Sequence, residues 1–282
     1  GILTMNFRFW QKFSLFANKS GDGNINCLHS NDKISKMDGI QIRDKSIKTI
    51  YRDESEIQKG NRLIVVHGDG TEEEVSSFPK LDLSFKGEYA LIKIHDDIVI
   101  TDSLKLVTGT GTYAEFSNKV RSEKAIFYLQ SFNCTLFVGK KTTLRNVKLY
   151  AGSDGKNLEI FIGEDCMFSF NVILRPTDVH TIFSLDNNKM PINRALMGIR
   201  IGDHCWIGQN AIITRDAVIP NNCIVGAGAV VTRRKFVDNC IIAGNPASII
   251  KKNVGWDRMG IENFIKKYQN GPPKGNLFWH SE

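Results

Sequence analysis

Apolar residues recur every six positions along one stretch of the chain, between residues 199 and 252. The repeated apolar positions are Ile201, Ile207, Ile213, Ile219, Val225 and Val231. A small residue follows four places after each of the first five, namely Cys205, Ala211, Ala217, Cys223 and Ala229. In an amphipathic helix apolar residues recur every three or four positions, and in a half-buried strand they recur every two positions. A step of six instead predicts short strands and turns coiled as a parallel β-helix, with equivalent apolar side chains stacked between coils.

The same step extends toward the N-terminus, with less regular spacing. It recurs at Val138, Leu144 and Tyr150, and again at Ile162, Phe168 and Leu174. Between residues 91 and 106 the bulky Ile98 and Leu104 occupy the small position, so we do not expect a regular coil there. We therefore predict an N-terminal extension of mixed structure over 1–80 and a β-helix domain over 81–254. The most regular part of the β-helix is expected at 136–252.

Helical spacing is found at both ends of the chain. Phe9, Phe13 and Phe16 fall on one face of a short predicted helix. A second helix and a tail are predicted within 255–282, where Ile261, Phe264, Ile265 and Tyr268 share one face. Because the apolar end of a β-helix needs a cover, we expect this second helix to supply it.

The repeat is interrupted once in its regular part. Leu174 and Ile201 are 27 positions apart, which is not a multiple of six, so a loop must leave the coil over 175–198. This loop contains Pro176, His180 and Pro191. Loops that project from a rigid repeat scaffold often carry the function, so we expect the chemistry here.

Composition limits the classes of ligand. The chain has 282 residues, a net charge of +7 and a pI near 9.0, which suits an anionic ligand but also an ordinary lysine-rich surface. No basic run alternates with aromatic residues, so nucleic acid is not an expected partner. No apolar run is long enough to span a bilayer.

The cysteines and histidines indicate core filling and no metal site. Of the six cysteines, Cys166, Cys205 and Cys223 occupy the small inward position of the repeat, so disulfides are not expected. The expected lack of disulfides predicts a reducing, cytoplasmic compartment. The inner face of the membrane belongs to that compartment. The histidines lack the spacing of a three-histidine zinc site, so no metal is predicted.

Three motifs resemble one enzyme family. They are IGDHCWIG at 201–208, GAGAVVT at 226–232 and AGNPA at 243–247. Together they are similar to the hexapeptide-repeat acyltransferases, and the resemblance covers residues 136–252. It implies an all-β fold, a left-handed parallel β-helix, with acetyl-coenzyme A as the co-substrate. It also implies a homotrimer whose active sites lie between subunits.

The loop sequence TDVHTIF at 177–183 resembles that of sugar and polysaccharide O-acetyltransferases of capsule and lipopolysaccharide synthesis. This implies that His180 is the catalytic base, since a neutral imidazole takes the proton of an attacking hydroxyl. The alternative is a solvated histidine. Asp178 would orient the imidazole, hold the acceptor hydroxyl or only cap the turn. Trp206 would line the acceptor and pantetheine tunnel, or pack at a trimer contact.

The resemblance also implies the coenzyme contacts. Backbone groups would hold the pantetheine arm, and side chains beside the nucleotide end would meet phosphate. The residues concerned are Gly208, Gln209, Gly226 and Ala227 for the arm, and Thr232, Arg233 and Lys251 for the phosphates. Ser248 departs from the arginine frequent at that position of the family. A covalent route through Cys205 is the less favoured alternative, because its side chain should point into the coil.

The sequence thus predicts an O-acetyltransferase that moves an acetyl group directly from acetyl-coenzyme A to a glycan hydroxyl. The glycan would be a capsular polysaccharide or a lipopolysaccharide. The alternatives are an acetyltransferase for a small acceptor, such as a free sugar, nucleotide sugar or antibiotic, and a catalytically silent β-helix scaffold.

Overall fold

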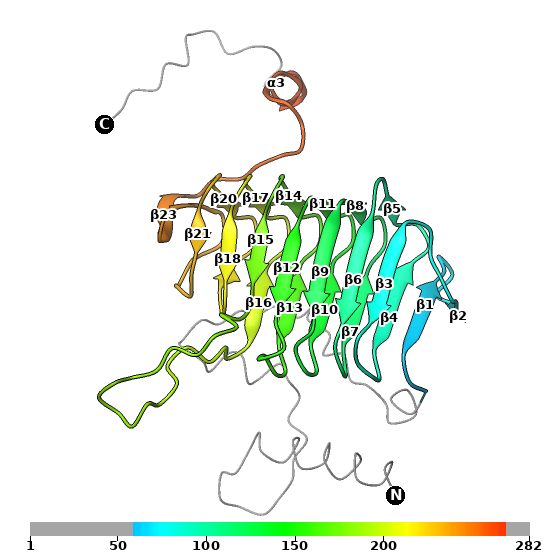
Figure 1. Cartoon of the computed structure of the whole chain (residues 1–282). Helices are drawn as coiled ribbons and strands as arrows, with labels where there is room; N and C mark the ends of the chain where they lie inside the picture. Colours follow the sequence, from blue (N-terminus) through cyan, green and yellow to red (C-terminus); the bar gives the residue numbers. More distant parts are fainter. Residues whose placement is uncertain (1–58, 269–282) are drawn as a thin grey trace, which may run out of the picture. The chain divides into compact units, whose positions relative to one another are not determined.

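The computed structural model describes residues 59–268, and these residues form a β-helix followed by one helix (Figure 1). The chain winds through three sheets in a fixed order, so that each coil contributes one short strand to each sheet. Neighbouring coils pair in parallel. The predicted fold class, an all-β left-handed parallel β-helix with a C-terminal helix, is confirmed.

The strands of the three sheets alternate along the chain. The first sheet contains β1 (Arg62–Val66), β2 (Glu72–Glu74), β4 (Leu91–His95), β7 (Tyr113–Phe116), β10 (Thr135–Val138), β13 (Glu159–Ile162), β16 (Gly198–Ile201) and β19 (Val218–Ile219). The second contains β5 (Val99–Ile100), β8 (Arg121–Glu123), β11 (Thr143–Arg145), β14 (Met167–Phe168), β17 (Trp206–Ile207), β20 (Ile224–Val225), β22 (Cys240–Gly244) and β23 (Ala247–Lys252). The third contains β3 (Leu81–Phe85), β6 (Leu104–Thr108), β9 (Ala125–Leu129), β12 (Lys148–Ala151), β15 (Ile173–Arg175), β18 (Ile212–Thr214) and β21 (Val230–Val231).

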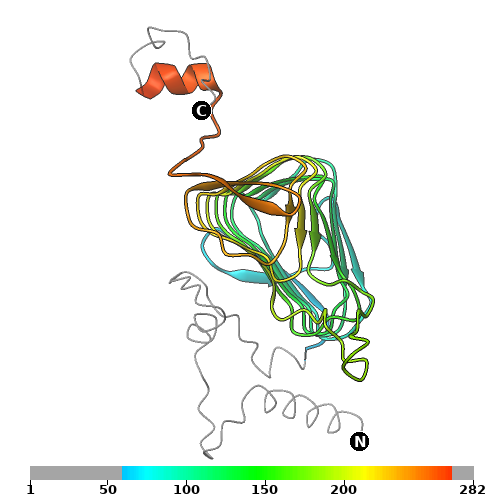
Figure 2. The same cartoon turned by 90° about the vertical axis from the view of Figure 1, so that its left-hand side faces the viewer.

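The six-residue repeat is confirmed where it is cleanest. All six repeated apolar residues from Ile201 to Val231 are buried, as are the five small residues between them. Successive coils there are three hexapeptides apart, since Trp206 pairs with Ile224 and Ile212 with Val230. Seen along the coils, these strands lie directly above one another (Figure 2). Burial in this stacked column removes every repeated side chain from water, which is the main stabilising term of the fold.

Earlier coils are longer, and their spacing differs from the six-residue prediction. Tyr150 faces outward and stacks on Tyr128 of the coil before, with ring centroids 5.6 Å apart. Leu149 is the inward residue instead, because the turn between β11 and β12 is one residue shorter than the repeat requires. Ile98 and Leu104 are both buried, and the strands around them pair in parallel, so a coil does form over 91–106 but with a longer spacing than three hexapeptides.

The corners between strands use left-handed backbone. Asn146, Asn171, Asn210 and Asn222 all have positive φ, a conformation that asparagine tolerates because its short amide bonds to local backbone. The Asn146 amide also donates to the Asn171 amide oxygen of the next coil. The recurring asparagines of the repeat therefore mark its turns.

The ends of the β-helix differ from the sequence prediction in two respects. The parallel pairing begins at β1, which pairs with β4 and precedes the predicted start at residue 81. The helix α3 (Ile261–Tyr268) exists, but none of its residues is buried, so it is not the predicted cover. The predicted helix around Phe9 and most of the predicted N-terminal extension lie outside the described residues. The domain boundaries therefore stay a prediction.

Candidate active site

The interruption predicted at 175–198 is a loop that leaves the third sheet after β15 and returns to the first sheet at β16 (Figure 1). His180 lies in its first part with an exposed side chain. The backbone N–H of His180 donates to the carbonyl of Asp178 at 2.8 Å. The loop therefore presents an imidazole to solvent from a tight local turn.

Asn193 pins the two arms of this loop together. Its amide nitrogen donates to the carbonyl of His180 at 2.8 Å and to the carboxylate of Asp178 at 3.0 Å. Its amide oxygen accepts from the backbone N–H of Ile182 at 2.9 Å. The residue is only 9% exposed, so these bonds form away from competing water. An asparagine amide carries both the N–H donors and the oxygen acceptor that these three bonds require.

Asp178 has partners other than the imidazole. Its carboxylate accepts from Arg215 Nε at 2.7 Å, in addition to the Asn193 amide. Arg215 lies at the corner that follows β18, one coil beyond the start of the loop. Of the three roles considered for Asp178, these contacts match the anchoring of a turn. Between Asp178 and His180, Val179 has a φ of 66°, which is strained for a β-branched residue and requires such anchoring.

The returning arm of the loop has a separate anchor. The buried carboxylate of Asp216 accepts from the backbone N–H groups of Leu196 and Met197, each at 2.9 Å. It also receives the N–H of Gly198 at 3.3 Å, where β16 begins. Both arms of the loop are therefore fixed to the corner formed by Arg215 and Asp216, which the sequence analysis did not single out.

Replacing Asn193 with alanine is expected to loosen the arm that carries His180. The variant leaves buried partners without their bonds, at a cost of about 1–3 kcal/mol for an unsatisfied group. We expect faster hydrogen exchange at the Ile182 amide, measured by mass spectrometry of the loop peptides. Asn187→Ala at the exposed tip is the matched control, since its hydrogen bond within residues 59–268 is made by its backbone carbonyl, which accepts from the Met190 N–H. Equal exchange in both variants would contradict the pinning role.

The residues predicted to hold the pantetheine arm lie together at another corner. Gly208 and Gln209 follow β17, and Gly226 and Ala227 follow β20 directly above them. Gly208 N–H donates to the Val225 carbonyl at 2.8 Å. A Cβ on Gly208 would lie 2.6 Å from the backbone nitrogen of Ala227, so this position has no room for a side chain. The two turns therefore stack backbone on backbone, and glycine at position 208 is required by this packing between coils.

Trp206 directly precedes this corner, in β17. Its side chain is directed outward, and the residue is 38% exposed. The indole N–H donates to the hydroxyl of Ser169 at 3.2 Å. One part of the ring is thus fixed and another part remains accessible to a ligand.

The three residues predicted near the phosphates lie on two elements. Thr232 and Arg233 follow β21, at the corner above Arg215, and Arg233 is exposed. Lys251 lies on β23 and pairs with Ile241 of β22. Thr232 and Arg233 thus follow a strand of the third sheet, whereas Lys251 lies on a strand of the second sheet.

Within one chain, the predicted site is divided. The His180 loop leaves the corner between the third and first sheets, whereas the glycine corner connects the second and third sheets (Figure 2). A strand of the third sheet, β18, separates the two corners along the coil. Three strand residues span about 10 Å. His180 and Trp206 consequently lie on different sides of the same β-helix.

Cys205 is buried, and its sulfur lies 3.0 Å from the Pro220 carbonyl. Burial raises the pKa of its thiol well above the usual value, and the neighbouring Cys166 adds to the effect. The thiolate is the nucleophilic form of cysteine, so this residue is not suited to a covalent route at neutral pH. Burial likewise raises the pKa of Cys223 to about 12.

Among residues 59–268, no group of three or more His, Cys, Asp or Glu side chains could hold a metal ion. None of the helices in the same range is long and apolar enough to cross a membrane.

Comparison with known proteins identifies the repeat. Residues 198–233 match the family model described as bacterial transferase hexapeptide (six repeats). The chain contains the hexapeptide repeat of bacterial transferases. This segment of hexapeptide repeat includes Trp206 and the glycine corner, but not His180.

Two relatives share a larger part of the sequence. A polysialic acid O-acetyltransferase of Neisseria meningitidis is 48% identical over 126 residues, which are 45% of this chain and 56% of that protein. A polysialic acid O-acetyltransferase of Escherichia coli O1:K1 / APEC is 37% identical over 123 residues, or 44% of this chain and 38% of that protein. The matched part thus spans about half the length of these relatives or less.

Solved structures extend the likeness beyond the hexapeptide repeat. The polySia-specific acetyltransferase NeuO superposes with a TM-score of 0.56 at 25% identity, covering 74% of this chain and 90% of that one. The polysialic acid O-acetyltransferase OatWY gives a TM-score of 0.54 at 27% identity, covering 68% of this chain and 91% of that one. The likeness to each of them therefore extends over most of the β-helix.

Proposed function

We propose that this chain is an acetyl-coenzyme A-dependent O-acetyltransferase that modifies a hydroxyl of an anionic capsular glycan. The observation that carries the proposal is the exposed His180 on a loop pinned by Asn193, Arg215 and Asp216. A base must be held at a fixed place to meet its substrate, and a merely solvated histidine needs no such anchoring. The similarity to two polysialic acid O-acetyltransferases supports the reaction and the class of acceptor.

In the proposed mechanism His180 acts as general base. Its neutral imidazole takes the proton of the acceptor hydroxyl as the oxygen attacks the thioester carbonyl of acetyl-coenzyme A. The carbon–sulfur bond breaks when the tetrahedral intermediate collapses, and the coenzyme leaves as a thiolate that receives the proton from the imidazolium. The acetyl group thereby moves directly to the acceptor, without an enzyme-bound intermediate. A backbone N–H would stabilise the negative oxygen of the intermediate.

The loop anchors support this role by fixing the backbone that carries the imidazole. Asn193 holds the carbonyl of His180 itself, and Asp178 and Arg215 hold the residues just before it. Correct placement of a reacting group contributes substantially to catalysis, since a displacement of about 1 Å costs about a hundredfold in rate. Asp178 is therefore proposed as a positioning residue that acts through the turn.

The glycine corner is the proposed place for the pantetheine arm. Gly208, Gln209, Gly226 and Ala227 lie together at one edge of the coil, where Gln209 and Ala227 are exposed and an amide-containing ligand can approach their backbone. Thr232, Arg233 and Lys251 are proposed to meet the phosphates of the coenzyme, where a guanidinium or ammonium favours anionic oxygen. The proposed use of acetyl-coenzyme A supports a cytoplasmic location for the reaction.

A homotrimer with active sites between subunits is part of the proposal. The separation of His180 and the glycine corner onto different corners of one β-helix supports it, because one subunit alone does not bring them together. Two adjacent copies can place the loop of one against the glycine corner of the next. Sedimentation with and without coenzyme tests this, and a fully active monomer would contradict it.

The acceptor class is tested with matched polymers. The chain has a net charge of +7, which favours an anionic polymer over a neutral one. We expect release of coenzyme A and a mass increase of one acetyl group with polysialic acid oligomers, and little of either with neutral dextran of equal length. Transfer to free sugars, nucleotide sugars or antibiotics alone would favour the small-acceptor alternative. Absence of transfer to any acceptor would favour the silent scaffold.

A further inference from the structure

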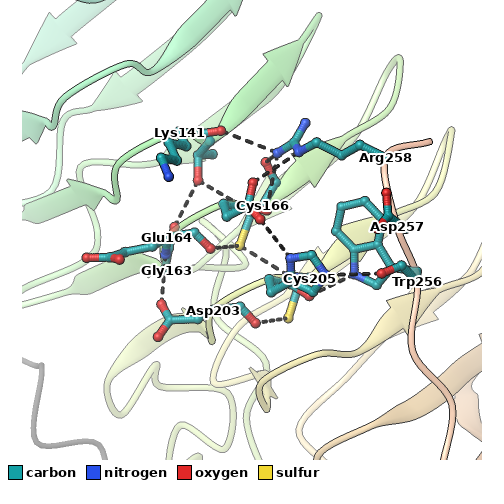
Figure 3. A network of polar contacts seen from close by, with 12 residues as sticks. Lys141, Gly163, Glu164, Cys166, Asp203, Cys205, Trp256, Asp257 and Arg258 are labelled. Carbon is teal, nitrogen blue, oxygen red and sulfur yellow. Dashed lines mark hydrogen bonds and ion pairs between the residues drawn. The ribbon is translucent and has the colours of Figure 1, made fainter. Parts of the chain in front are cut away.

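The segment that follows β23 lies against the turns that lead from the first sheet into the second sheet. We name its residues 253–259 the C-terminal strap. Two of its side chains, Trp256 and Arg258, contact turns of successive coils (Figure 3). These turns contain Lys141, Asp165 and His204, which all have positive φ and precede β11, β14 and β17. Because the strands pair in register, the three turns lie in one row.

Arg258 joins two turns of this row. Its Nε lies 3.0 Å from a carboxylate oxygen of Asp165. One terminal nitrogen donates to the carbonyls of Cys166, Asp165 and Lys141, at 2.9, 3.2 and 3.3 Å, and the other donates to the hydroxyl of Thr143 at 3.2 Å. The planar guanidinium offers five donors in a rigid fork, so an ammonium could not replace all of these bonds.

Trp256 is held on the third turn of the row. Its indole N–H donates to the carbonyl of His204 at 2.8 Å, and its ring stacks on the imidazole with centroids 4.4 Å apart. The two imidazole nitrogens of His204 lie 2.8 Å from Asp165 and 3.1 Å from the Trp256 carbonyl. The Arg258 guanidinium also lies over the Trp256 ring, 5.7 Å from its centroid. Asp165 thus contacts both Arg258 and His204. It therefore links the contacts made by Arg258 to those made by Trp256, which packs on His204.

Trp206 lies next to this assembly, two residues beyond His204. Its ring centroid is 6.1 Å from that of Trp256, with the planes tilted by 44°. The ring is therefore bounded by Trp256, while its N–H is held by Ser169. Loss of the strap would remove the aromatic neighbour and leave the indole with fewer constraints on its rotamer.

We propose that Trp256 and Arg258 are positioning residues that fix the indole of Trp206 for the glycan acceptor. The role of Trp206 in acceptor binding rests on the proposed function, whereas the fixing of its ring does not. The strap acts through Trp206 and does not itself carry out chemistry. Its contribution should appear mainly in the KM for the acceptor.

The test uses the full chain with Arg258→Ala, Arg258→Lys and the exposed control Lys266→Ala. Each protein carries 5-fluorotryptophan at the four tryptophans, and Trp206→Phe and Trp256→Phe assign the two resonances. We expect Arg258→Ala to shift or broaden the fluorine resonance of Trp206 and to raise the acceptor KM about tenfold, with kcat less affected. Arg258→Lys should restore part of both effects, because it keeps the charge opposite Asp165. Lys266→Ala should change neither.

An unchanged Trp206 resonance in a folded Arg258→Ala protein would overturn the positioning role. So would a loss of kcat with the acceptor KM unchanged, because that indicates a general structural effect. A shifted Trp206 resonance in a protein that acetylates no acceptor would support the positioning and overturn the proposed acetyl transfer. The two proposals are thereby tested separately.

Discussion

The His180→Ala variant is expected to transfer acetyl groups about 10²–10⁴ times more slowly than the unmodified chain, because it lacks the general base. The imidazole is exposed, and only the backbone of His180 takes part in the described loop contacts. Its removal should therefore leave the fold and the binding of acetyl-coenzyme A unchanged. Steady-state release of coenzyme A measures turnover, and calorimetry measures coenzyme binding.

His67→Ala is the matched control for this experiment. His67 is a surface residue of the first coil, and its ring nitrogens lie 3.2 Å from Asp96 and from Glu73. Both contacts are exposed to solvent, so their loss should affect stability little. We therefore expect normal turnover in this control. Turnover of His180→Ala close to that of the control would reject His180 as the base.

The Phe168→Ala variant is expected to lose about 3–5 kcal/mol of unfolding free energy. Phe168 lies in β14, fully buried between Leu144 of the coil before and Ile207 of the coil after. Truncation of this ring leaves a cavity inside the column on which the β17 strand and Trp206 rest. Because each coil of a solenoid contacts only its neighbours, the lost contacts are not replaced from elsewhere. Chemical denaturation followed by circular dichroism measures the effect.

Phe170→Ala is the control, since it is the same substitution two residues away at an exposed position. Phe170 is 42% exposed, and its ring centroid lies 5.4 Å from the guanidinium carbon of Arg145. A cation–π contact at an exposed site contributes about 0.5–1 kcal/mol, so we expect a loss within that range. Similar losses for the two variants would contradict the inward position of Phe168.

The accuracy of the sequence prediction follows the regularity of the repeat. Where each coil is three hexapeptides long, all the apolar and small positions predicted from spacing between Ile201 and Val231 are buried. At Tyr150 the prediction was wrong, because one residue fewer in a turn reverses which side chain faces inward. Strand periodicity has only two faces, so a shift of one position exchanges them. Turn length is set by packing between coils, which a fixed period does not include.

The residues that anchor the candidate site were not predictable in the same way. Asn193, Arg215 and Asp216 are polar residues without a motif, and they act only because the loop folds back onto the next coil. The strap residues Trp256 and Arg258 lie beyond the end of the repeat and contact turns that are 50 to 120 positions earlier. No local pattern reports such contacts.

The sequence by itself determined the parallel β-helix, its inward residues in the regular coils and the place of the interrupting loop. Each of these follows from local periodicity, because the same side chain must be buried once in every turn. Only the tertiary structure decided that Asp178 anchors a turn, that His180 and Trp206 lie on different sides of one chain, and that Trp256 of the strap lies beside the Trp206 ring. Those facts depend on how coils of unequal length stack, which brings together residues distant in the chain.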